Sequence, residues 1–146
     1  MAFRFALAAV LKFRESIEQQ EYLALERIQQ EIAQTERRLL KCDERIAAAT
    51  KRREAELARG VVSIHLQSAY EETLALQKQR EALQAKLQEL QSKRQEQIKS
   101  YEVARQKREI LDELRTRQLE AYRRDQATRQ QKMLDDIFLS RRKRSY

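Results

Sequence analysis

The chain has 146 residues, of which 37% are charged, with no proline, one glycine and a formal net charge of +8. Proline and glycine make most turns, so sandwiches, barrels and βαβ folds, which reverse direction after roughly every ten residues, are excluded. Alanine and glutamine, 18 of each, add to many Glu, Lys, Arg and Leu residues, all good helix formers. This composition is typical of a long helix or a coiled coil.

The first predicted helix covers about residues 3–59. Its apolar or small side chains recur at alternating steps of three and four residues, which is the spacing of a coiled-coil seam. The seam residues are Leu25, Ile28, Ile32, Thr35, Leu39, Cys42, Ile46 and Ala49, and the series extends less regularly to Ile17, Leu11 and Leu7 and to Arg53 and Leu57. Cys42, the only cysteine, is therefore expected to be a small buried hydrophobe rather than a reactive group.

A tight turn is predicted at residues 59–63. Gly60 is the only glycine and suits the left-handed conformation that closes a helix, and Ser63 is a suitable N-cap for the next helix. Helices joined by a short loop lie antiparallel. The alternative, one continuous helix in a parallel dimer, leaves Gly60 unexplained, so we expect an all-α, two-helix antiparallel coiled-coil hairpin that forms a single domain over residues 1–146.

The second predicted helix covers about residues 64–139 and is followed by a basic tail, 140–146. Its seam runs through Leu66, Ala69, Thr73, Leu76, Arg80, Leu83, Leu87, Leu90, Arg94, Gln97, Tyr101, Ala104, Arg108 and Leu111. Polar seam positions cost stability, but they fix the register of the two helices or mark a surface that binds something else.

The two arms of this hairpin have unequal lengths. Phe3 is expected to lie opposite about Leu119, so the second helix has no partner in its own chain after about Tyr122. That overhang contains Met133, Leu134, Ile137, Phe138 and Leu139, and apolar side chains spaced i, i+1, i+4 and i+5 along it form a stripe. An exposed stripe of this kind indicates a partner surface, with a contact between two copies or a disordered end as alternatives.

Positive charge is concentrated near the same end of the chain. Residues 105–146 hold 13 basic and 7 acidic residues and finish in Arg141-Arg142-Lys143-Arg144. A basic end can bind nucleic acid, an anionic membrane or an acidic protein surface, and the alternative is a solvated tail.

A second candidate surface lies near the turn. Tyr70 and Leu74 are four residues apart, hence on one helix face, and one position away from seam residues. Val61, Val62 and Ile64 add apolar surface there. A tip exposed to water has no structural need for these side chains, so we expect either partner docking or local packing.

The sequence has no recognisable catalytic or metal-binding motif. No glycine-rich phosphate loop or Ser/His/Asp set is found, and Cys42 and His65 do not make a zinc site. A two-helix hairpin also offers no concave substrate pocket. The apolar run Ala6–Leu11 is too short for a secretory signal, and no stretch reaches the roughly 18 apolar residues of a membrane span. We therefore expect a cytoplasmic, non-enzymatic protein without a cofactor.

The beginning of the chain resembles the flagellar FliJ family. The matching residues are Met-Ala-Phe-Arg-Phe-Ala-Leu, then Val10-Leu11 and Arg14-Glu15, with a similar end at Lys132-Met133-Leu134-Asp135-Asp136-Ile137. The resemblance implies a stalk of the flagellar type III export apparatus, similar to the central stalk of rotary ATPases and associated peripherally with the inner membrane. It also implies that one end enters the hexameric export ATPase and that the tip meets the cytoplasmic linker of the export gate, and export chaperones.

Candidate partner-binding residues follow from these expectations. The tip surface comprises Tyr70, Leu74, Val62 and Ile64, and the open-end surface comprises Phe3, Phe5, Leu134, Ile137, Phe138, Arg141 and Arg142.

Three other interpretations remain open. The first is the equivalent stalk of a virulence type III secretion system, which genomic neighbours would distinguish. The second is a basic coiled coil that binds nucleic acid, although its basic residues are interspersed with acidic ones until the last six positions. The third is a membrane-surface helix formed by Phe3, Phe5 and Leu7, which would more simply pack against the segment from Leu111 to Tyr122.

Overall fold

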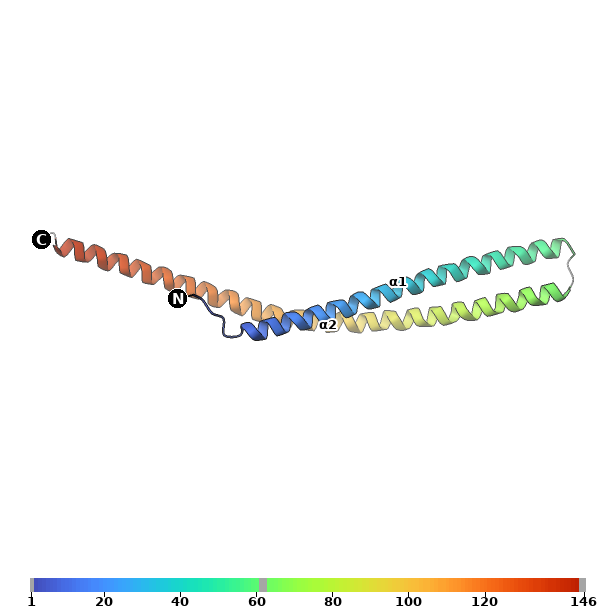
Figure 1. Cartoon of the computed structure of the whole chain (residues 1–146), viewed down its shortest axis with the longest axis horizontal. Helices are drawn as coiled ribbons and strands as arrows, with labels where there is room; N and C mark the ends of the chain where they lie inside the picture. The colour runs from blue at the N-terminus through green and yellow to red at the C-terminus, as the bar shows by residue number, and fades with distance from the viewer. Residues whose placement is uncertain (1, 61–62, 145–146) are drawn as a thin grey trace. The chain divides into compact units, whose positions relative to one another are not determined.

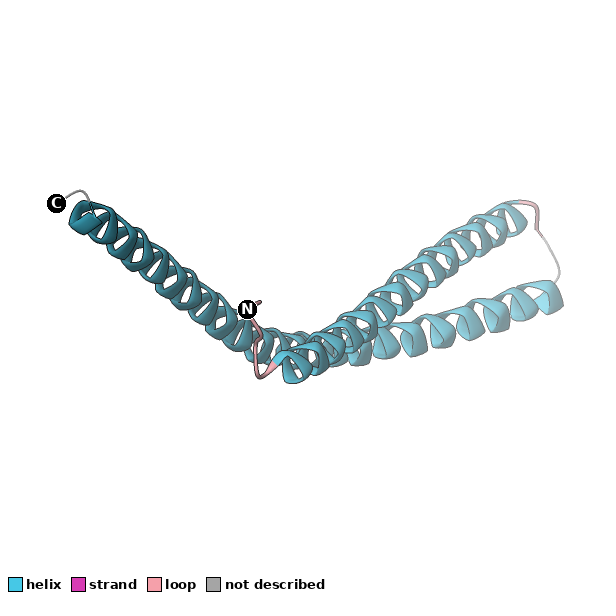
Figure 2. Ribbon diagram, turned by 60° about the vertical axis from the view of Figure 1, so that its left-hand side comes forward, coloured by secondary structure: helices cyan, strands magenta, loops and turns pink. Residues whose placement is uncertain are grey.

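The computed structural model describes residues 2–60 and 63–144, and those residues form two long helices and no strand (Figures 1 and 2). Helix α1 spans Ala8–Ala58 and has 51 residues, and α2 spans Ser63–Arg144 and has 82 residues. The helices run in opposite directions and pack against each other, which confirms the expected all-α hairpin with unequal arms.

The helix ends differ from the sequence expectation by a few residues. Helix α1 begins at Ala8 rather than near residue 3, because residues 2–5 are irregular and residues 6 and 7 form a turn. The N–H of Ala8 donates to the carbonyl of Phe5 at 3.1 Å, which closes that turn. Helix α2 continues to Arg144, so most of the expected tail is helical. The basic side chains in its last turn interact favourably with the negative end of the helix dipole.

Helix α1 ends at a left-handed glycine, as the sequence suggests. Gly60 has a φ of +72°, a conformation that L side chains rarely adopt. Its N–H donates to the carbonyl of Leu57 at 3.2 Å, and the N–H of Arg59 is shared between the carbonyls of Ala55 and Glu56. These bonds satisfy carbonyl groups that the end of a helix otherwise leaves without a partner.

The two seams account for the burial in the structure. Every first-helix residue of the series from Leu25 to Ala49 is buried or half-buried, and so is every second-helix seam residue except Arg94. Thr35 is the most buried of them, at 2% exposure, and its hydroxyl donates to the carbonyl of Glu31 at 2.8 Å. The extension to Leu57 is wrong: Leu57 is exposed, and Glu56 holds the half-buried position.

The chain divides into two compact units. One, here called the open-end unit, comprises Met1–Gln20 and Glu102–Tyr146, and the other, the loop unit, comprises Glu21–Tyr101. Each contains part of α1 and part of α2, and each is described by itself.

In the loop unit, polar seam residues find partners on the opposite helix. Arg80 Nε lies 2.6 Å from Asp43 Oδ1, close enough for an ion pair. The amide of Gln97 donates to the backbone carbonyl of Glu21 at 3.0 Å and also to its carboxylate. The thiol of Cys42 is buried and donates to the carbonyl of Leu76 at 3.3 Å. Arg80, Gln97 and Cys42 therefore contribute specific cross-helix contacts that favour this register.

Candidate partner-binding surfaces

The C-terminal part of α2 continues beyond the region that α1 covers. We call residues 123–144 the unpaired arm. From residue 127 onward every described side chain in it is exposed. Leu134 is 61% exposed and Phe138 66% exposed, values that leave these large apolar side chains in contact with water. The structure thus places an uncovered apolar stripe where the sequence suggested one.

The stripe continues the seam of α2. From Gln126 the steps to residue 130, Met133 and Ile137 are four, three and four residues, the same alternation that brings α2 seam residues against α1. Leu134 and Phe138 widen this face. The face that packs against α1 earlier in the helix therefore persists in the unpaired arm, where no described residue of the chain covers it.

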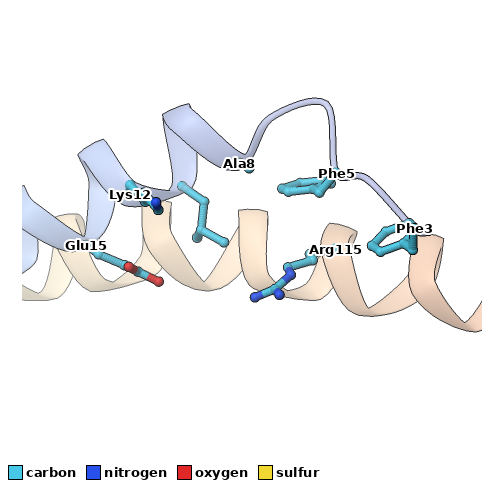
Figure 3. Close-up of a pocket in the computed structure, with 7 residues that line it drawn as sticks. Phe3, Phe5, Ala8, Lys12, Glu15 and Arg115 are labelled. Carbon is cyan, nitrogen blue, oxygen red and sulfur yellow. The ribbon is translucent and has the colours of Figure 1, made fainter.

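Phe3 and Phe5 lie away from the stripe. Phe5 is buried, and the ring of Phe3 is half-buried with its centroid 5.7 Å from that of Tyr122. Figure 3 shows the N-terminal segment leaving α1 at Ala8, with the ring of Phe5 turned back towards the helix and Phe3 beside α2. At 1.5 Å per residue, Leu134 is about 18 Å along α2 from Tyr122, so the structure does not bring these phenylalanines together with Leu134.

A small cavity accompanies this N-terminal segment. Its volume is about 240 Å³, and Phe3, Phe5, Ala8, Leu11, Lys12, Glu15 and Arg115 line it (Figure 3). The two phenylalanines form part of its wall, so they act in the packing of the N-terminal segment. The open-end residues that remain exposed are Leu134, Ile137, Phe138, Arg141 and Arg142.

The tip residues are exposed as a binding surface requires. Tyr70 is 59% exposed, Leu74 is 40% exposed, and Ile64 is also exposed. Val62 lies outside the described residues. The seam residues next to this face, Ala69 and Thr73, are half-buried and buried, so Tyr70 and Leu74 are displaced from the packing surface.

The sequence reasoning missed one apolar cluster. Val10, Phe13 and Ile110 are exposed although they lie close to seam residues of the open-end unit. Their positions next to the seam could have identified them. Polar residues are expected at such positions in a two-helix hairpin, and these three are apolar.

The described residues contain no group of three or more His, Cys, Asp or Glu side chains placed to hold a metal ion. Within the same ranges, neither helix has a stretch apolar enough to cross a membrane.

This fold defines a class: a two-helix coiled-coil hairpin whose large exposed apolar side chains suit contacts with other macromolecules. The family model described as "Flagellar FliJ protein" matches residues 3–145, so the chain belongs to the FliJ family. That family has a flagellar export-related role and is a non-catalytic component of the export apparatus. The expected resemblance is thereby confirmed. Comparison with curated proteins and with solved structures gave no significant match.

Proposed function

We propose that the chain is a non-enzymatic stalk of the flagellar type III export apparatus. In this proposal the unpaired arm binds the hexameric export ATPase. The tip residues bind the cytoplasmic linker of the export gate or an export chaperone, and the protein acts in the cytoplasm beside the inner membrane. Membership of the FliJ family supports the flagellar setting, and the two exposed apolar surfaces support binding of partners.

The unpaired arm is the observation that carries the proposal. Leu134, Ile137 and Phe138 share one helix face, and every side chain around them is exposed. The basic residues Arg141–Arg144 follow within two turns. Apolar contacts supply affinity, whereas concentrated charge accelerates and orients the encounter. This combination suits insertion of a helix into a ring whose inner surface is partly acidic.

The expected strength of this contact is moderate. Complete burial of a Leu, Ile or Phe side chain contributes about 1.5–3 kcal/mol. Three such side chains contribute several kcal/mol before the cost of association and of ordering the helix end is subtracted. Substitution of all three should therefore abolish a measurable interaction.

The test is truncation of the chain after Arg129, followed by assay of the ATP hydrolysis rate of the purified export ATPase. The removed residues that the structure describes are all exposed, so the stability of the remaining hairpin, measured by its melting temperature, should hardly change. Stimulation of the ATPase should disappear. A matched control replaces Leu139, which lies on the opposite side of α2 from Ile137, with Ser and should keep the stimulation. Full stimulation by the truncated chain contradicts the proposed role of this arm.

A further inference from the structure

The residues beside the seam form two distinct flanks. In this antiparallel hairpin, residues that immediately precede seam positions lie on one side of the helix pair. The ion pair between Arg52 and Glu72, at 3.7 Å, joins two such residues, which precede Arg53 and Thr73. We call this side the preceding flank, and the side of residues that immediately follow seam positions the following flank.

Two cavities of the loop unit confirm this geometry. One, of about 310 Å³, is lined by residues that precede seam positions on both helices: Arg38, Lys41 and Arg45 from α1 and Gln79 from α2, beside Cys42 and Leu83. Another, of about 320 Å³, is lined by residues that follow seam positions: Asp43 from α1, and Gln77 and Glu81 from α2, beside Ile46 and Arg80. Each flank is therefore built from both helices, and the same rule applies to the open-end unit.

In the open-end unit the preceding flank is apolar. The positions that precede the buried or half-buried seam residues hold Val10, Phe13 and Ile17 on α1 and Val103, Lys107 and Ile110 on α2. Ile17, which the sequence spacing assigned to the seam, is half-buried beside Glu18, and Glu18 makes the cross-helix bond to Arg108. Leu114 and Arg117 extend it along α2 at the same spacing. Phe13 is 61% exposed and Ile110 is 64% exposed.

These apolar residues also lie at the same level along the hairpin. Arg108 bonds to Glu18, so the antiparallel arrangement brings Phe13, about one turn earlier in α1, opposite the α2 segment that begins near Ile110. Single exposed apolar residues are ordinary on any protein surface. Four of them, Val10, Phe13, Val103 and Ile110, are exposed on one side of the two helices and form an apolar strip that Lys107 interrupts, a grouping typical of an interaction site.

The following flank of the same unit is polar. It holds Lys12, Glu15 and Gln19 on α1 and Arg105, Glu109, Asp112 and Thr116 on α2. Two of these residues, Arg105 and Glu109, pair with each other at 2.8 Å. A two-helix hairpin that meets only water needs two polar flanks. One apolar flank beside one polar flank is instead the pattern of a helix pair that receives a third helix on one side.

Charge indicates which third helix fits. The preceding flank from Val10 to Ile17 and from Val103 to Arg117 contains no carboxylate. It contains Lys107 and Arg117, and neither forms an ion pair with a carboxylate of the described chain. We propose that this flank binds an amphipathic helix of another protein whose apolar stripe is bordered by Asp or Glu. This surface includes neither the unpaired arm nor the tip residues.

A second copy of the chain suits this site less well. The apolar stripe of the unpaired arm is followed by Arg141–Arg144, whose positive charge would approach Lys107 and Arg117. Like charges at an interface oppose association. Self-association is therefore an outcome that the experiment must separate from binding of an acidic helix.

The experiment uses the full-length protein and two synthetic helical peptides of three heptads with the same leucine stripe. One peptide carries Glu at the positions bordering the stripe and the other carries Lys. Fluorescence anisotropy of labelled peptide should show at least about tenfold tighter binding of the Glu peptide at low salt, with the difference decreasing as salt screens it. Combined Phe13→Ser and Ile110→Ser substitutions should weaken the binding of the Glu peptide about tenfold.

Two further variants separate binding from folding. Gln19→Ser with Thr116→Ala changes the following flank and should leave peptide binding unchanged. Lys107→Glu with Arg117→Glu keeps the apolar strip and should reverse the preference towards the Lys peptide. Equal binding of both peptides, no binding of either, or loss of binding in the following-flank control overturns the proposal. The proposal is also overturned if the protein sediments as a dimer and the Phe13→Ser and Ile110→Ser substitutions make it monomeric, because a second copy then occupies the strip.

Discussion

Arg108 and Glu18 are joined across the open-end unit by a charged hydrogen bond, with Arg108 Nε 2.5 Å from Glu18 Oε2. The side chains are 24% and 18% exposed, and Asp112 accepts a second bond from Arg108 at 2.6 Å. The pKa of Arg108 is raised above its usual range, mainly by the hydrogen bond to Glu18 and secondly by the bond to Asp112. The guanidinium therefore stays charged at a half-buried seam position.

We expect Arg108→Ala to lower the free energy of unfolding by about 1–3 kcal/mol, because it leaves the partly buried carboxylate of Glu18 without its partner. Thermal or urea unfolding followed by circular dichroism measures this. The control is Arg105→Ala, which removes an exposed pair with Glu109 and should cost less than about 0.5 kcal/mol. The charge swap Glu18→Arg with Arg108→Glu should recover part of the loss. Equal effects of Arg108→Ala and Arg105→Ala would show that the cross-helix pair adds no stability.

The antiparallel register predicts a specific disulfide. Because the thiol of Cys42 contacts the backbone of Leu76, a Leu76→Cys variant should form an intrachain disulfide under mild oxidation. Non-reducing electrophoresis detects this as a faster monomer band. The control places the thiol at exposed Leu40 in a variant with Cys42→Ala and Leu76→Cys, and should give little intrachain product. Only interchain dimers from the first variant would contradict the hairpin.

Gly60→Ala should destabilise the hairpin by about 1 kcal/mol, because alanine resists a φ of +72°. An added Cβ meets no atom within 4 Å, so the cost is conformational and not steric. Gly60→Asn should cost less, since asparagine tolerates this region better. Urea unfolding of the original chain and the two variants ranks them by stability. An alanine variant as stable as the original would show that this position does not require glycine.

Tyr70→Ala with Leu74→Ala should leave the melting temperature nearly unchanged, because both side chains are exposed beside the seam. Flagellar export, measured as secreted flagellar protein and as swimming, should decrease. As a control, Ala69→Ser at the neighbouring half-buried seam position should lower the melting temperature. A large loss of melting temperature with normal export would show that Tyr70 and Leu74 are packing residues.

Neutralisation of Arg141–Arg144 should weaken stimulation of the export ATPase without abolishing it, since charge mainly accelerates encounter. The difference in ATPase stimulation between the original chain and this variant should be largest at low ionic strength. It should decrease as salt rises, because salt screens the charges of the original chain as well. Steady-state ATP hydrolysis at several salt concentrations measures it. A deficit independent of salt would indicate that these residues make specific contacts instead.

The repeat of seam residues made the two helices and their pairing predictable, and the single glycine marked where the first helix ends. Thr35, Cys42 and Ala49 were expected in the seam and are buried, because a heptad repeat has only one face that fits a partner helix. The side-chain partners of the polar seam positions were not predictable. Whether Arg108 pairs with Glu18 depends on the axial register, which the spacing of apolar residues does not resolve to a single residue.

The N-terminal residues show why the site was predicted less well than the fold. The sequence predicted that Phe3 and Phe5 belong to the first helix and to the open-end surface. Residues 2–7 are not helical, however, and Phe5 is buried. Helical propensity does not reveal such a departure, because tertiary burial of two aromatic rings decides it. The exposure of Phe13 and Ile110 was likewise hidden until both helices were paired.

The contact between Phe3 and Tyr122 also sets a boundary on α2. At Tyr122 the helix still contacts Phe3 near the start of the chain, and from residue 127 to residue 144 every side chain is exposed. The length of single helix available to a partner is therefore determined by where the N-terminal segment stops, and not only by where α2 ends. An insertion before Ala8 would shorten the uncovered part of the C-terminal arm, and a deletion there would lengthen it, without changing any residue within the arm.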